Sequence, residues 1–118
     1  LSEDAAVGRI VIVGYSFGAL AGLPVAHDDG RVAAAAGISP PTVMAPFDYL
    51  SDFAKPLLVI AGSSDEFSDG RKLKELVRPP NGSFELLPGV DHFYIGQELR
   101  VGGLVVEFMQ RLQREAKI

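Results

Sequence analysis

The stretch RIVIVGYSFG, residues 9–18, decides the fold of this chain. Its apolar run at 10–13 is typical of a strand that is buried on both faces of a parallel sheet. Small and apolar residues continue from Phe17 to about His27, which favours a helix directly after that strand. Pro24 is expected to kink or end this helix. The pattern therefore predicts a strand, a sharp turn and a helix in immediate succession.

Ser16 occupies the sharp turn, in the pattern Gly14-Tyr15-Ser16-Phe17-Gly18. A G-x-S-x-G pattern between a strand and a helix predicts a nucleophile elbow, in which a strained backbone lifts the serine hydroxyl out of the sheet. The two glycines are expected to let the strand and the helix approach closely. The helix N-terminus presents N–H groups without intrahelical partners, and the N–H of Phe17 is the expected donor to an oxyanion.

The elements after this turn are also short. Further strands are expected at 32–38, 56–62 and 83–87, and helices at about 69–77 (capped by Ser68 or Asp69) and 97–117, with one helical turn near 48–53. The alanines of 32–38 favour a helix, but the short run between two loop signals favours a buried strand, which we expect. Strands that alternate with helices imply an α/β fold. We predict one domain, 1–118, with a small parallel sheet of about four strands and helices on both faces.

Composition excludes several classes of function. The 118 residues carry a net charge of −4 and no cysteine. Without a basic patch we expect no nucleic-acid partner, and without thiolates or clustered histidines we expect no metal and no cofactor. No apolar stretch approaches the roughly 20 residues of a membrane span, so we expect no membrane partner. These features indicate a soluble, cytoplasmic protein.

A serine hydroxyl needs a neighbouring base to become a nucleophile, and the chain has two histidines. His92 lies in a loop just beyond the fourth expected strand, whose carboxyl end should lie beside Ser16. His27 lies at the far end of the first helix and is expected to point away. His92 is therefore the expected base.

The acid that orients the imidazole should follow an intervening strand. Asp65 comes directly after the strand at 56–62, and Glu66, Asp69 and Asp91 are its rivals. Asp91 is the immediate neighbour of the histidine, which makes a good hydrogen bond to the ring awkward. The chain order serine, acid, histidine that Asp65 gives is one of the known triad orders.

These motifs together resemble the C-terminal half of an α/β-hydrolase, close to the dienelactone hydrolase-like and small bacterial esterase branch. The similar segments are GYSFG at 14–18, KPLLVIAG at 55–62 running on to Asp65, and LPGVDHF at 87–93. The resemblance implies a serine hydrolase with Ser16 as nucleophile, Asp65 as acid and His92 as base. Its substrate would be a small carboxylic ester, contacted by Tyr15 and Phe93.

The chain also departs from that family pattern. Members normally have strands before the elbow strand, and a loop there supplies a second oxyanion N–H, whereas only eight residues precede Arg9 here. We therefore expect a truncated domain without the usual N-terminal strands, and weak, broad activity on small activated esters. The first strand would leave a long apolar edge, which predicts a homo-oligomer.

Other functions remain to be weighed against the esterase. Lipase or thioesterase action would use the same residues. A non-catalytic remnant that acts as an oligomerisation module predicts no activated serine. Dinucleotide binding would need a glycine in place of Ser16 and an acidic residue about 20 positions later, and the chain has neither.

Overall fold

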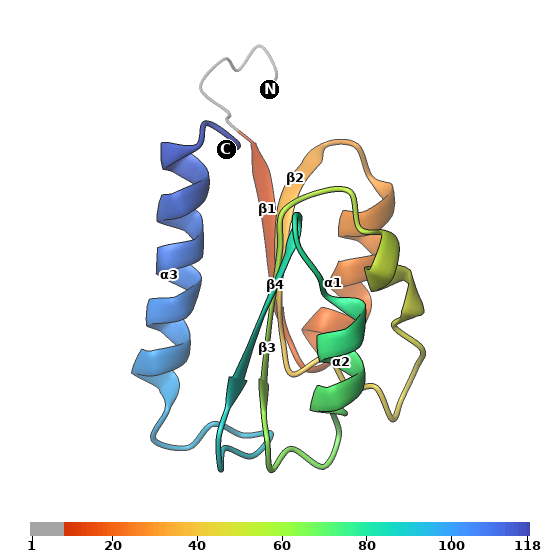
Figure 1. Ribbon diagram of the computed structural model, residues 1–118, viewed down its shortest axis with the longest axis vertical. Coiled ribbons are helices and arrows are strands. Elements are labelled where there is room, and N and C mark those ends of the chain that lie inside the picture. The colour runs from red at the N-terminus through yellow and green to blue at the C-terminus, as the bar shows by residue number, and fades with distance from the viewer. Residues whose placement is uncertain (1–8) are drawn as a thin grey trace.

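The computed structural model describes residues 9–118. Strands and helices alternate along the chain as the sequence predicts (Figure 1). The elements are β1 (Ile10–Tyr15), α1 (Phe17–Asp28), β2 (Val32–Ile38), the 3-10 helix η1 (Asp48–Asp52), β3 (Leu57–Gly62), α2 (Gly70–Leu76), β4 (Gly82–Leu87) and α3 (Glu98–Arg114).

The four strands form one parallel sheet in the order β1-β2-β3-β4. The alanine-rich segment 32–38 is a strand because it lies between β1 and β3, where Ala34, Ala35 and Ala36 are fully buried. This burial overrides the helical propensity of alanine. The predicted α/β class and the parallel four-stranded sheet are confirmed.

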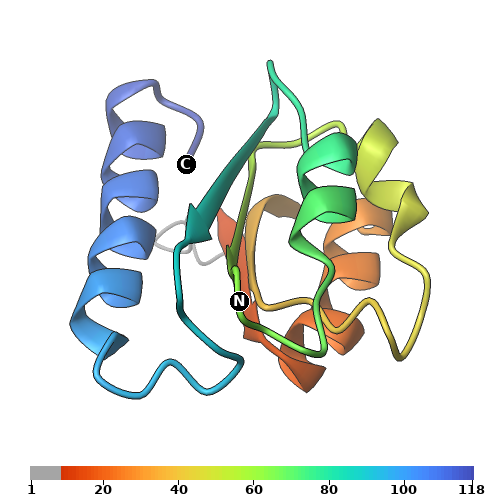
Figure 2. The same cartoon turned by 60° about the horizontal axis from the view of Figure 1, so that its bottom comes forward.

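Helices cover both faces of the sheet, as expected. Figure 2 shows α3 on one side and α1, η1 and α2 on the other. Successive side chains of β3 alternate between the two cores, which follows from the period of two in a strand. Leu57 and Val59 pack with α1 and α2 residues such as Leu23 and Leu73, whereas Leu58 and Ile60 pack with Phe108 and Leu112 of α3.

Two details of the helices bear on the sequence predictions. Pro24 lies inside α1 and does not end it; the helix continues to Asp28. A proline in this position removes one helical hydrogen bond, which the packing of α1 against the sheet tolerates. Asp69 caps α2, because its carboxylate accepts the N–H groups of Arg71 and Lys72.

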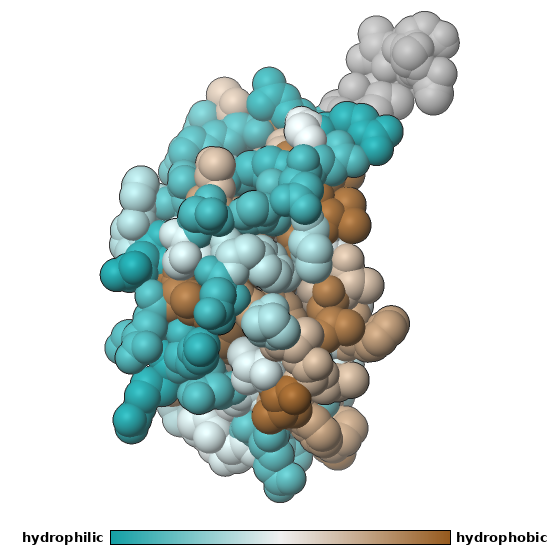
Figure 3. All heavy atoms as spheres, turned by 90° about the vertical axis from the view of Figure 1, so that its right-hand side faces the viewer, coloured by the Kyte–Doolittle hydropathy of each residue, from teal (hydrophilic) through white to brown (hydrophobic). Residues whose placement is uncertain are grey.

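The surface over α1, η1 and α2 is mainly hydrophilic, and its hydrophobic atoms gather along one side (Figure 3). Exposed large hydrophobic residues include Phe17 and Val25 of α1 and Val43 and Met44 of the loop after β2. Between residues 9 and 118, no helix has both the length and the apolar character that crossing a membrane requires.

Candidate active site

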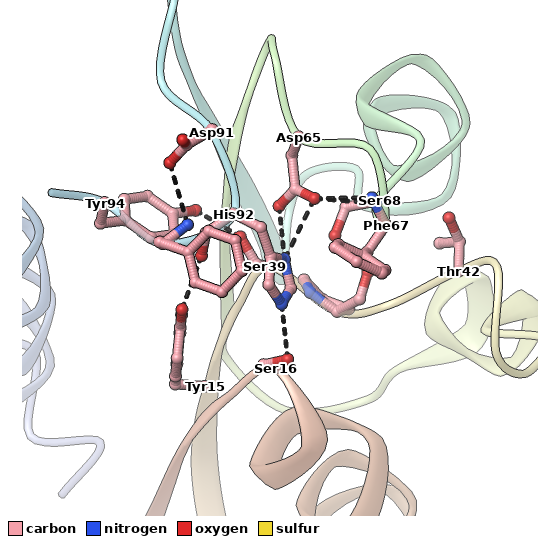
Figure 4. A network of polar contacts seen from close by, with 12 residues as sticks. Tyr15, Ser16, Ser39, Thr42, Asp65, Phe67, Ser68, Asp91, His92 and Tyr94 are labelled. Carbon is pink, nitrogen blue, oxygen red and sulfur yellow. Dashed lines mark hydrogen bonds and ion pairs between the residues drawn. The ribbon is translucent and has the colours of Figure 1, made fainter.

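The carboxyl ends of the parallel strands meet at one edge of the sheet, at the bottom of Figure 1. Ser16 directly follows β1, Asp65 lies in the loop after β3, and His92 lies in the loop after β4. In an open α/β sheet this edge is where ligands bind. Figure 4 shows that the three side chains point toward one another there.

The backbone at Ser16 adopts a conformation that few residues other than glycine tolerate, with φ 54° and ψ −113°. Strain of this kind clusters at functional sites. A Cβ at Gly14 would lie 2.5 Å from the carbonyl oxygen of Gly18, so β1 and α1 can approach this closely only with glycine there. At Gly18 a Cβ would meet open space, so the expectation that both glycines are needed holds for Gly14 alone.

The first turn of α1 leaves N–H groups beside the serine. Those of Ala19 and Leu20 donate to the Ser16 carbonyl. The N–H of Phe17, the residue next to the serine, precedes the first helical hydrogen bond and has no acceptor within the helix. It therefore has the position expected of an oxyanion donor. Any second donor from residues 1–8 lies outside the described residues.

His92 links the serine to a carboxylate. Its Nε2 lies 2.6 Å from Ser16 Oγ, and its Nδ1 lies 3.0 and 2.9 Å from the two carboxylate oxygens of Asp65. An ionised carboxylate can only accept a hydrogen bond, so Nδ1 carries the proton. The lone pair on Nε2 is then free to accept the proton of the serine hydroxyl.

The Asp65 carboxylate is buried and well satisfied. Its side chain is 0% exposed, and that of His92 is 10% exposed. Its Oδ1 also accepts the backbone N–H groups of Phe67 and Ser68 at 2.8 and 3.2 Å. Hydrogen bonds of this kind compensate the cost of burying a charge. They also fix the oxygens that orient the imidazole.

No side-chain hydrogen bond joins a rival acid to the His92 ring among the described residues. Glu66 is exposed, and Asp69 caps α2. The Asp91 carboxylate accepts the N–H of Phe93 at 3.0 Å, within its own loop. Asp65 is thus the candidate acid that the structure brings to His92.

His27 lies away from this site, at the end of α1. Its Nδ1 is 2.6 Å from Asp28 and its Nε2 is 2.7 Å from Asp52. Hydrogen bonds to these two carboxylates, that of Asp28 first, raise the pKa of His27 above its ordinary value of 6.5. The structure does not bring this histidine to Ser16.

Aromatic residues surround the His92 ring. The rings of Phe67, Phe93 and Tyr15 have centroids 4.8, 5.6 and 5.7 Å from it. Tyr15 and Phe93, the expected substrate contacts, also line an apolar groove of about 580 Å³ between β1 and α3. Phe93 is 63% exposed, so its ring is open to a ligand. The Tyr15 hydroxyl instead donates to the backbone carbonyl of His92 at 2.6 Å.

Sequence reasoning missed Ser39 and Tyr94. Their hydroxyls form a buried hydrogen bond of 2.6 Å between the end of β2 and the loop after β4, and both residues have positive φ. Ser39 follows β2 directly, and this position at a strand end was the one signal that could have indicated it. Within residues 9–118, no group of three or more His, Cys, Asp or Glu side chains could hold a metal ion.

The parallel sheet, the crossover helices and the serine at the turn after β1 define part of an α/β-hydrolase domain. A profile of the Dienelactone hydrolase family matches residues 2–99. The chain belongs to the dienelactone hydrolase family.

Solved structures show the same fold. A putative α/β-hydrolase of unknown function from Agrobacterium tumefaciens is 24% identical with a TM-score of 0.80, covering 91% of this chain and 52% of its own. An α/β serine hydrolase homologue from Coxiella burnetii is 28% identical with a TM-score of 0.72, and the match covers 90% of this chain and 51% of the homologue. An esterase from Pyrococcus furiosus is 19% identical with a TM-score of 0.71, and the match covers 94% of this chain and 57% of the esterase.

This chain therefore spans about half the length of the solved structures it matches. No curated protein matches it.

Proposed function

We propose that this chain is a serine hydrolase that cleaves small carboxylic esters through an acyl-enzyme. The observation that carries the proposal is the chain of contacts from Ser16 Oγ through the His92 imidazole to the buried Asp65 carboxylate. Nucleophile, base and orienting group lie within the hydrogen-bond distances that such a triad requires.

The reaction takes place in two halves. Ser16 Oγ attacks the ester carbonyl carbon while His92 Nε2 accepts the hydroxyl proton, and the N–H of Phe17 donates to the oxyanion. The alcohol leaves with the proton from Nε2, and the acyl group remains on Oγ. Water then attacks the acyl-enzyme with His92 again as base, and the carboxylic acid is released.

The open site favours small, activated esters. Loss of one oxyanion donor typically costs about 10²–10³-fold in turnover, so a good leaving group matters most if Phe17 acts alone. Tyr15 and Phe93 of the groove are 45 and 63% exposed, which favours broad rather than tight specificity. Membership of the dienelactone hydrolase family supports this reaction class. Lipase and thioesterase action would use the same three residues.

Intact mass after incubation with a fluorophosphonate tests the proposal. We expect one adduct on the parent chain, because an activated Ser16 displaces fluoride from phosphorus. The adduct should be absent from Ser16→Ala and retained in Ser51→Ala, which alters an exposed serine of η1. A folded parent chain without an adduct would contradict the proposal.

We propose self-association as a second candidate function. β1 lies at one end of the strand order, and its Ile10, Val13 and Tyr15 are 46, 48 and 45% exposed. An apolar edge strand is a template for pairing, and a second copy of this chain can present the same strand antiparallel to it.

Light scattering during size-exclusion chromatography tests this association. We expect a dimer of the parent chain and a monomer of Val13→Lys, since a charge on the edge opposes strand pairing. A monomeric parent at high micromolar concentration would contradict it. If the chain were only an association module, it would form the dimer but no fluorophosphonate adduct.

A further inference from the structure

The loop that carries His92, residues 88–97, is held by anchors at the other strand ends. The Gly89 N–H donates to the Ser63 hydroxyl, and the Val90 carbonyl accepts the Ser64 N–H. Both of these anchors directly follow β3. At the last residue of β3, Gly62, a Cβ would lie 2.0 Å from the Val90 carbonyl oxygen. The first part of the loop is therefore packed directly on the end of β3.

The second part of the loop is anchored to β1 and β2. The Tyr15 hydroxyl at the end of β1 donates to the His92 carbonyl at 2.6 Å. The Tyr94 hydroxyl pairs with that of Ser39 after β2. Tyr15 thus provides the anchor on the backbone of His92 itself.

Tyr15 directly precedes Ser16, so two hydrogen bonds join the end of β1 to His92. One link is the hydrogen bond between Ser16 Oγ and His92 Nε2, and the other joins the Tyr15 hydroxyl to the His92 carbonyl. The Tyr15 and His92 rings also stack, at an interplanar angle of 29°. Because these two hydrogen bonds connect the same short segments, they restrict the distance between Ser16 and the His92 imidazole.

We infer that Tyr15 is a positioning residue, whose hydroxyl holds His92 at the distance and angle at which Nε2 can accept the Ser16 proton. This inference rests on the proposed function for its effect on rate. It goes beyond the expected role of Tyr15 as a wall of the substrate site, because the hydroxyl acts on the histidine rather than on the ester.

The state of the hydroxyl is consistent with this role. Burial, followed by the charges of Asp65 and Asp91, raises the pKa of Tyr15 above its ordinary value of 10. The phenol therefore stays protonated at neutral pH and can donate to the carbonyl.

Tyr15→Phe tests the inference, because it removes the hydroxyl and keeps the ring. Tyr49→Phe is a matched control: the Tyr49 hydroxyl is buried without a hydrogen-bond partner among the described residues. The rate of fluorophosphonate labelling is measured for each folded variant. We expect about a tenfold slower rate for Tyr15→Phe and an unchanged rate for Tyr49→Phe, because misplacement of a reacting group by about 1 Å can cost up to 10²-fold.

Imidazole NMR supplies a readout that does not need catalysis. The chain has two histidines, so the His27 resonances serve as an internal reference. We expect Tyr15→Phe to shift or broaden the His92 ring resonances and to leave those of His27 unchanged.

Each outcome decides the inference. If the parent is labelled, a slower Tyr15→Phe with altered His92 resonances supports it. Labelling at the parent rate, or slower labelling with unchanged His92 resonances, overturns it. If the parent is not labelled, the proposed function fails, and the NMR alone decides: altered His92 resonances support positioning by Tyr15, and unchanged resonances overturn it.

Discussion

The two histidines differ in what their ring nitrogens contact. Each ring is hydrogen-bonded at both nitrogens, but His27 lies between two carboxylates whereas His92 lies between a carboxylate and a hydroxyl. Two carboxylates favour a proton on both nitrogens, which leaves no lone pair to accept another. A carboxylate at Nδ1 and a hydroxyl at Nε2 leave one lone pair of the His92 ring facing the Ser16 hydroxyl. The chemical nature of the second partner, rather than the number of hydrogen bonds, therefore makes His92 the candidate base.

Burial separates the two sites further. The Asp28 and Asp52 side chains are 78 and 75% exposed, so water screens their attraction for His27. The Asp65 side chain is fully buried, and backbone N–H groups hold it in place. An ion pair at the surface adds little stability, whereas a buried carboxylate fixes the tautomer and orientation of its histidine.

The largest effect expected is that of replacing each histidine in turn. We expect His92→Ala to slow fluorophosphonate labelling and ester hydrolysis by about 10⁶-fold, since a triad without its base retains only binding and oxyanion stabilisation. His27→Ala should stay within about twofold of the parent in both assays. Equal losses in the two variants would remove the functional distinction between the sites.

The carboxylates provide a smaller effect of the same kind. We expect Asp65→Asn to reduce the labelling rate by about 10⁴-fold, because an amide cannot hold the Nδ1 proton as a carboxylate does. Asp52→Asn is the matched control at the other histidine, and its labelling rate should equal that of the parent. An Asp65→Asn variant as reactive as the parent would show that another group orients His92.

The smallest effect concerns stability at His27. Its pKa is raised in the folded state, so its contribution is fully present below the unfolded value of 6.5 and is lost as pH rises through the folded value. We expect His27→Ala to lower Tm by a few degrees at about pH 5.5, corresponding to less than about 1 kcal/mol, and by less at about pH 8.5. Added salt should shrink the difference at the lower pH. A larger loss at the higher pH would contradict the raised pKa.

The fold and the three candidate site residues could be predicted because each signal is local. Three kinds of signal can be read along the chain: apolar runs of strand length, Gly14 in the turn that carries Ser16, and the positions of Asp65 and His92 just after strands. Parallel strands then bring their carboxyl ends to one edge, so a residue that follows one strand is placed near a residue that follows another. Asp65 follows its strand more closely than Asp69, and it is Asp65 that lies at His92.

Other features could not be predicted because they depend on how distant segments pack. The alanines of β2 form a strand only because neighbours bury both of its faces. Pro24 remains inside α1 because the helix is held by its packing on the sheet. The Tyr94 and Ser39 hydroxyls meet across the sheet edge, although neither residue has a pattern around it that indicates the contact.

Local patterns in this chain therefore specify the order of its strands and helices, the turn at Ser16 and the candidates for acid and base. These depend on periodicity and on backbone preferences, which act over a few residues. The contacts that hold His92 were settled by three-dimensional packing, as in the bond from the Tyr15 hydroxyl to a carbonyl 77 residues away. Such a bond depends on strand register and loop path together, because a shift of either by one residue would move the hydroxyl out of reach.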